Sequence, residues 1–168
     1  MSLIGLDQVS QEHLNTAGGK GANLGELIKQ GFPVPPGFIV AAQEYAVFLD
    51  GLDIPANDDI PADTEAFLAD IRTKILATPL NESLLDEIKR HHEILAATRP
   101  SDLVYAVRSS ATAEDLADAS FAGQHDTYYY VAADSIGLMV KKCWASLWSD
   151  AAFSYRHTQG IEHRTVYM

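Results

Sequence analysis

The sequence predicts a mixed α/β or α+β domain. Several segments repeat apolar residues at the 3.6-residue spacing of an amphipathic helix, and short apolar or β-branched segments lie between them. The order of these elements does not follow a strict strand–helix alternation, which favours a mixed layer architecture. With 168 residues, the chain is one domain or one piece of a larger protein, and it is long enough to bury a core.

The first part of the chain should open with a strand, a helix, a second strand and a short helix. These elements are expected at 2–6, 22–30, 38–41 and 43–49. Leu24, Leu27 and Ile28 share one face of the first helix. Gly31 ends that helix, and the prolines within 32–37 keep the chain extended before the second strand.

The rest of the chain should be mainly helical. The expected elements are a surface loop at 50–61, helices at 63–77 and 82–97, a buried strand at 103–107, a strand at 126–132, helices at 135–148 and 151–157, and the beginning of a strand at 165–168. Asn81 and Asp134 are candidate N-caps. Cys143 and Trp144 lie on the apolar stripe of their helix, and Trp148 is expected to anchor the core with them. Among the tyrosines 128–130, at least one ring should be in the core.

Composition excludes several classes of function. A formal net charge of −11 argues against sequence-independent DNA binding and against attachment to an anionic membrane surface. No apolar run has the length of a membrane span, and no secretory signal opens the chain. Cys143 is the lone cysteine, and the six histidines show no metal-binding spacing. We therefore expect a cytoplasmic protein with no nucleic-acid or membrane partner.

The most informative segment is 107–116, Val-Arg-Ser-Ser-Ala-Thr-Ala-Glu-Asp-Leu. Arg108 ends an apolar run, and the small residues after it would let backbone N–H groups approach an anion. This pattern indicates a phosphate site. A structural ion pair of Arg108 with Glu114 or Asp115 is an equal alternative. The two acids could be metal-linked or catalytic, but they are more typical of caps on a short helix that begins after Thr112.

Two further segments have the same character. Residues 18–25, Gly-Gly-Lys-Gly-Ala-Asn-Leu-Gly, place Lys20 where a helix should begin, but they match neither the Walker A nor the G-x-G-x-x-G spacing. A structural turn and a phosphate site both remain open there. In 120–124, Gly123 would permit a loop to close over a phosphate chain, and an ordinary hairpin is the alternative.

Taken together, these motifs resemble the N-terminal nucleotide-binding domain of the phosphoenolpyruvate synthase (pyruvate, water dikinase) family, whose ATP site is of the ATP-grasp kind. The matching segments are 18–27, 31–38, 107–116, 119–124 and 142–156. The chain, residues 1–168, therefore looks like the first part of an ATP-grasp domain, and the resemblance covers nearly all of it.

The resemblance implies roles for particular residues. Lys20 and Arg108 would hold the phosphates of ATP, and Arg108 would also be catalytic. Gly123 and Thr127 would belong to the loop and strand that cover the phosphates, with Gln124 beside them. Ala151 stands where family members often carry an arginine, so any role of that arginine is lost or moved.

The family converts ATP, pyruvate and water to phosphoenolpyruvate, AMP and phosphate by way of a phosphohistidine. The acidic ligands of Mg²⁺, a Gln-x-Arg element, the phosphohistidine domain and the pyruvate domain have no counterpart before Met168. We therefore expect the 168 residues alone to be inactive, to bind ATP weakly and to self-associate.

Two alternatives stay open. Rifampin phosphotransferases share the same motifs, and 162–168 resemble them at least as well, so the acceptor could be a rifamycin instead of pyruvate. A stand-alone, non-catalytic nucleotide-binding module is the other alternative.

Overall fold

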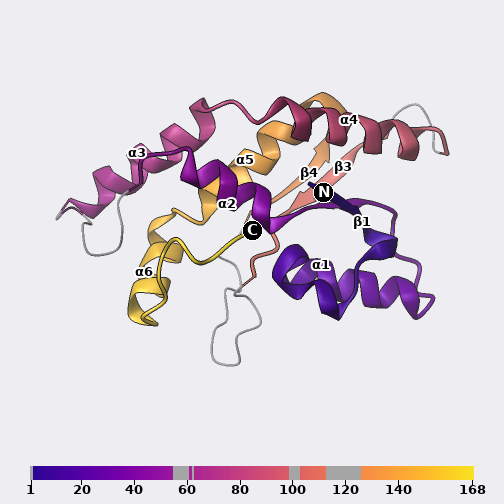
Figure 1. Cartoon of the computed structure of the whole chain (residues 1–168), viewed down its shortest axis with the longest axis horizontal. Coiled ribbons are helices and arrows are strands. Elements are labelled where there is room, and N and C mark those ends of the chain that lie inside the picture. Colours follow the sequence, from indigo (N-terminus) through magenta and orange to yellow (C-terminus); the bar gives the residue numbers. More distant parts are fainter. Residues whose placement is uncertain (1, 55–60, 62, 99–102, 113–125) are drawn as a thin grey trace.

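The computed structural model describes residues 2–54, 61, 63–98, 103–112 and 126–168, and within them it is an α+β structure, as the sequence predicts (Figure 1). The strands are β1 (Leu3–Gly5), β2 (Phe38–Val40), β3 (Tyr105–Arg108) and β4 (Thr127–Val131). The α-helices are α1 (Leu14–Lys29), α2 (Ala42–Asp50), α3 (Thr64–Ala77), α4 (Glu82–Ala96), α5 (Ile136–Ser146) and α6 (Asp150–Thr158). Short 3₁₀ turns at Leu6–Gln8, Gln11–His13 and Ala133–Ser135 connect some of them.

Two small antiparallel sheets lie at the centre of the fold. In one, β1 pairs with β2; in the other, β3 pairs with β4 (Figure 1). An irregularity between Tyr105 and Val107 shifts the register of the second pair, and on the opposite strand Tyr130 has a φ of 56°. A bulge of this kind increases the local twist and re-aims side chains. It leaves the Tyr130 ring 87% exposed.

The main core forms where α5 packs against α3, with α2 beside it. Trp144 and Trp148 are both fully buried, as the sequence predicts, and the Nε1 of Trp148 donates a 2.8 Å hydrogen bond to the hydroxyl of Tyr45. This bond satisfies a polar group that would be costly to bury alone. Cys143 is also buried, which confirms its interpretation as a core residue.

Several expectations need correction. The first helix begins at Leu14 instead of 22, because its glycine-rich beginning is helical on both sides of a break at Gly18. The strand at 103–107 is not buried: Val104 is 50% exposed, since β3 has β4 on one edge and its faces are only partly covered. Residues 165–168 form no strand, although Tyr167 hydrogen-bonds Thr112.

Of the two predicted N-caps, one is confirmed and the other is wrong. The side chain of Asn81 accepts a hydrogen bond from the backbone N–H of Ser83 at the beginning of α4, which confirms that cap. Asp134 caps no helix, because a 3₁₀ turn precedes α5 and the carboxylate accepts a bond from the hydroxyl of Ser135 instead.

Of the three tyrosine rings at 128–130, only Tyr128 packs against the core, and it is partly buried. Within the described part of the chain, no helix is long and apolar enough to cross a membrane.

A buried polar cluster joins α6 to the end of the chain. Arg156 is fully buried and its Nε donates a 3.1 Å hydrogen bond to the Nδ1 of His163. The His163 ring stacks on Phe153 with 4.0 Å between centroids. Burial, reinforced by the charges of Arg156 and His157, lowers the pKa of His163 to about 4. Burial also lowers the pKa of Arg156 to about 10.

The low pKa of His163 predicts acid sensitivity. Above pH 6.5 the imidazole is neutral in the folded and unfolded states; between pH 6.5 and about 4 only the unfolded chain binds the proton, so stability falls as the pH falls. The loss should be on the order of 3 kcal/mol by pH 4. Urea unfolding of the wild type and His163→Gln from pH 7.5 to 4.5 should give a shallower pH dependence for the variant. Parallel curves would contradict this prediction.

The positive φ of Tyr130 predicts a stabilising substitution. A β-carbon strains this backbone conformation, and asparagine tolerates it better than tyrosine does. Tyr130→Asn should therefore raise the free energy of unfolding by about 0.5 kcal/mol or more. Tyr129→Asn is the control, because Tyr129 is also exposed but has no positive φ, and asparagine should destabilise the strand there. Equal effects of the two substitutions in urea unfolding would refute the strain.

Candidate functional site

A break in α1 creates the first half of the candidate site. Gly18 has φ 67° and ψ 171°, so the chain leaves the helical conformation there and re-enters it at Gly19. Only glycine adopts this conformation readily. Lys20 and Gly21 therefore lie in the first turn of the longer helical part, where backbone N–H groups lack helical partners. The helix thus resumes at this motif, earlier than the expected start at 22, and a helical turn precedes it.

The segment that follows β3 packs against this turn. The Nζ of Lys20 lies 3.2 Å from the carbonyl oxygen of Ser109, and the N–H of Gly21 donates a 3.1 Å hydrogen bond to the hydroxyl of Ser110. A β-carbon on Gly18 would collide with the carbonyl oxygen and hydroxyl of Ser110. The glycine-rich motif at 18–25 and the motif that contains Arg108 therefore lie against each other.

Arg108 and Thr127 face each other across the second sheet. They are partners in the register of β3 and β4, and both side chains are exposed. The guanidinium of Arg108 lies 5.8 Å from the centroid of the Tyr129 ring, a cation–π distance. The arginine is thus steered by a neighbouring ring on its own sheet and remains accessible to solvent.

Three of the predicted site residues, Lys20, Arg108 and Thr127, thus lie around the segment 109–112. Gly123 and Gln124 fall outside the described residues. So do Glu114 and Asp115, and with them the alternatives of an ion pair with Arg108 and of a capped helix after Thr112.

The beginning of β4 completes the wall of the site. Both the N–H and the hydroxyl of Ser109 point to the carbonyl oxygen of Asp126, at 3.4 and 3.2 Å. The Asp126 carboxylate accepts a 2.6 Å hydrogen bond from the Tyr128 hydroxyl. Burial and the charge of Asp126 raise the pKa of Cys143 to about 12, against the opposing effect of Lys20. Cys143 is therefore a neutral thiol at this wall and not a nucleophile.

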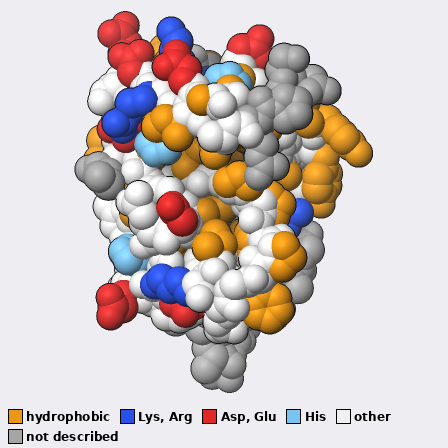
Figure 2. Space-filling view, turned by 90° about the vertical axis from the view of Figure 1, so that its right-hand side faces the viewer, with side chains coloured by type: hydrophobic (Ala, Val, Ile, Leu, Met, Phe, Trp, Pro, Cys, Tyr) orange, Lys and Arg blue, Asp and Glu red, His pale blue; other side chains and the backbone are white. Residues whose placement is uncertain are grey.

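A cleft of about 700 Å³ adjoins these residues. It lies between α1 and β2 on one side and β3 and α5 on the other, and Lys20, Arg108 and Ser110 line one part of it. Most of its remaining lining is apolar, including Leu24 and Val107. Figure 2 shows hydrophobic side chains exposed in the middle and along the right-hand side of one face of the molecule. The combination of an apolar cleft with a few converging polar groups is typical of a ligand site.

Sequence reasoning missed two contacts. The hydroxyl of Ser110 bonds the helix start at Gly21, and Thr112 bonds the backbone of Tyr167. Both join positions far apart in the chain, so no local spacing could reveal them. The run of small hydroxyl residues after Arg108 was the available signal, and it pointed to the segment without naming the partners.

The comparison with protein families decides the assignment. Residues 14–168 match the model of the family described as "Pyruvate phosphate dikinase, AMP/ATP-binding domain". The chain belongs to this family. Both halves of the candidate site lie inside the matched region, which confirms the resemblance inferred from the motifs.

Three relatives show what kinds of protein the chain is similar to. The chain is 41% identical to a probable phosphoenolpyruvate synthase of Staphylothermus marinus over 99% of its own length and 22% of the relative's. It is 36% identical to the phosphoenolpyruvate synthase of Pyrococcus furiosus, over 96% of its own length and 25% of the relative's. It is also 41% identical to a rifampicin phosphotransferase of a Streptomyces species, over 99% and 20%. The chain thus spans a fifth to a quarter of the length of these relatives.

The close approach at Gly18 predicts a large effect of a single methyl group. Gly18→Ala should destabilise the fold by about 2 kcal/mol or more, since it adds a collision with Ser110 to the strain of a positive φ. Gly31→Ala is the matched control, because Gly31 also has a positive φ of 81° but has no atom near the added carbon. The control should lose only about 1 kcal/mol. Equal losses in urea unfolding would show that the contact with Ser110 contributes nothing.

Proposed function

We propose that this chain binds the phosphate groups of ATP at the segment 109–112. The observation that carries the proposal is that Lys20 bonds the carbonyl of Ser109, the residue next to Arg108, and that Lys20 and Arg108 line the same cleft. The match to an AMP/ATP-binding family supports the choice of ATP as the ligand.

The proposed roles follow from the chemistry of each group. Lys20 supplies a compact charge that can move from the carbonyl of Ser109 to a phosphate oxygen, and Arg108 supplies a planar fork of donors. The hydroxyl of Thr127, opposite Arg108, is a further donor. Gly123 and Gln124 stay in the proposal as residues of a covering loop, on the strength of the sequence resemblance. Fixed donors of this kind stabilise the charge of a transferring phosphoryl group, and on this basis Arg108 is the proposed catalytic residue.

We propose that these residues belong to a longer protein, here called the natural polypeptide, and that it catalyses the reaction of a phosphoenolpyruvate synthase. Its substrates would be ATP, pyruvate and water, and its products phosphoenolpyruvate, AMP and phosphate. The names of the Staphylothermus and Pyrococcus relatives support this choice. The chain would contribute the first part of the nucleotide site, and the acceptor would bind elsewhere in the polypeptide.

A rifamycin is the second candidate acceptor. The rifampicin phosphotransferase of Streptomyces is as similar to this chain, at 41% identity, as the Staphylothermus synthase is. Since residues 1–168 concern the nucleotide and not the acceptor, turnover assays of the natural polypeptide with pyruvate and with rifampicin would separate the two candidates. Phosphorylation of rifampicin without conversion of pyruvate would overturn the synthase proposal.

Mg²⁺ is the metal that phosphoryl transfer from ATP would require, because it neutralises the phosphate charge. In the part of the chain that the structure describes, no group of three or more His, Cys, Asp or Glu side chains is placed to hold a metal ion. We therefore assign no metal ligand to these residues, and no role proposed above depends on one.

Removal of the positively charged side chain of Arg108 or of Lys20 should weaken the nucleotide site. Arg108→Ala in the natural polypeptide should lower ATP-dependent turnover more than tenfold, because one charged contact to phosphate contributes about 1.4 kcal/mol or more. Lys20→Ala should lower ATP affinity by about tenfold for the same reason. Steady-state kinetics and calorimetry with ATP measure the two effects.

Lys29→Ala is the matched control. Lys29 lies on the same helix as Lys20 and carries the same charge, but it is exposed and its nearest acid is Glu26 at 3.8 Å. Its removal should leave ATP affinity and turnover within about twofold of the wild type. If Arg108→Ala retained near-normal turnover, the assignment of Arg108 to the phosphate site would fail.

A further inference from the structure

The segment 109–112 is also held by the end of the chain. The N–H of Thr112 donates a 2.9 Å hydrogen bond to the carbonyl oxygen of Tyr167. The Thr112 hydroxyl lies 3.3 Å from the same carbonyl and accepts a 3.2 Å hydrogen bond from the N–H of Tyr167. Thr112 therefore pairs with Tyr167 in both directions, and its hydroxyl takes the place that a backbone carbonyl has in a β-ladder.

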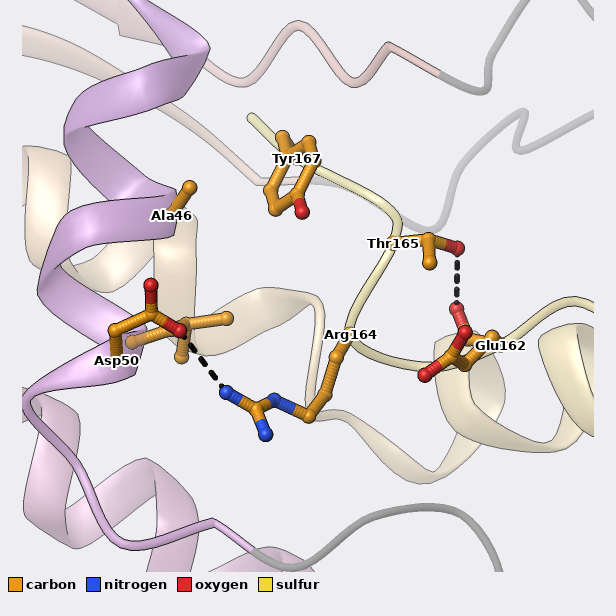
Figure 3. Close-up of a pocket in the computed structure, with 7 residues that line it drawn as sticks. Ala46, Asp50, Glu162, Arg164, Thr165 and Tyr167 are labelled. Atoms are coloured by element: carbon orange, nitrogen blue, oxygen red, sulfur yellow. Dashed lines mark hydrogen bonds and ion pairs between the residues drawn. The ribbon is translucent and has the colours of Figure 1, made fainter.

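The partner of Thr112 belongs to a well-anchored segment, 161–168, which we name the strap. The side chain of Arg164 forms a 3.0 Å ion pair with Asp50 at the end of α2, and the hydroxyl of Thr165 donates a 2.9 Å bond to the carbonyl of Glu162 (Figure 3). His163 is bonded by the buried Arg156. Figure 3 shows the strap beside α2, where Tyr167 and Ala46 line the same small pocket.

The apolar residues of the strap fix it further. Val166 and Met168 are 2% and 7% exposed and belong to the core. Ala111, the residue before Thr112, is fully buried in the same core. The strap is thus anchored to α2, to α6 and to the core, and so is Thr112, which it bonds.

We propose that Thr112 is a positioning residue of the phosphate site: its hydroxyl locks the segment 109–112 onto the strap. This inference rests on the proposed function. On one side, Lys20 and Gly21 bond Ser109 and Ser110; on the other, Tyr167 bonds Thr112. A segment held at both ends keeps the adjoining Arg108 and Lys20 in one arrangement, so that little conformational entropy is lost when an anion binds.

The threonine hydroxyl is the part of this lock that a substitution can remove. Thr112→Val keeps the shape of the side chain and the backbone bond to Tyr167, but it abolishes both hydroxyl contacts. Thr112→Ser keeps the hydroxyl and should behave as the wild type. Thr165→Val is the matched control, because it removes a hydroxyl bond within the strap that does not reach the segment 109–112.

The test uses the natural polypeptide and two measurements. Calorimetry with ATP should show affinity reduced about fivefold in Thr112→Val, restored in Thr112→Ser and unchanged in Thr165→Val. Amide hydrogen exchange without nucleotide should show residues 109–112 exchanging about tenfold faster in Thr112→Val only. Because exchange needs no ligand, it tests the lock independently of ATP binding.

Each result has a separate meaning. Wild-type affinity in Thr112→Val, or unchanged exchange at 109–112, would overturn the positioning role while leaving the proposed function intact. Equal losses in Thr112→Val and Thr165→Val would also overturn it, since the effect would then be a general loosening of the strap. If the unsubstituted polypeptide bound no ATP, the proposed function would fail, and with it the role of Thr112 in nucleotide binding.

Discussion

The contact between the start of α1 and the segment after β3 is the constraint on which the candidate site depends. Gly18 turns the chain through a conformation with φ 67°, and the space left by its missing side chain is filled by Ser110. The N–H of Gly21 and the Nζ of Lys20 then reach Ser110 and Ser109. A β-carbon at Gly18 would collide with Ser110, so the two motifs could not keep this contact.

The helical core holds the second sheet, and with it the segment that makes this contact. The bond between Trp148 and Tyr45 lies in the fully buried region where α5 and α2 meet, and Cys143 of α5 lies close to Asp126 at the start of β4. The second sheet is therefore held by the same helix that fills the core. Arg108 projects from that sheet, so its position depends on core packing although its side chain is exposed.

A buried polar cluster lies where α6 meets the strap. Arg156 is fully buried, and its Nη1 and Nη2 have no hydrogen-bond partner among the residues that the structure describes. Its Nε bonds His163, and its guanidinium lies 5.6 Å from the Trp148 ring. Burying a charge with so few partners is unfavourable, and here it accompanies the fixing of the strap against α6.

The sequence by itself determined most of the helices and the core aromatics, because these follow from local periodicity and residue type. The stripe that carries Cys143 and Trp144 predicted α5, and Arg108 and Lys20 were recognisable beside small residues. Only the tertiary structure decided which motifs meet. Lys20 and Ser109 are 89 positions apart, and their contact depends on the break at Gly18 and on the packing of β3. The same holds for Thr112 and Tyr167, 55 positions apart: hydrogen bonds over such separations have no periodic signature, and chain folding alone brings the partners together.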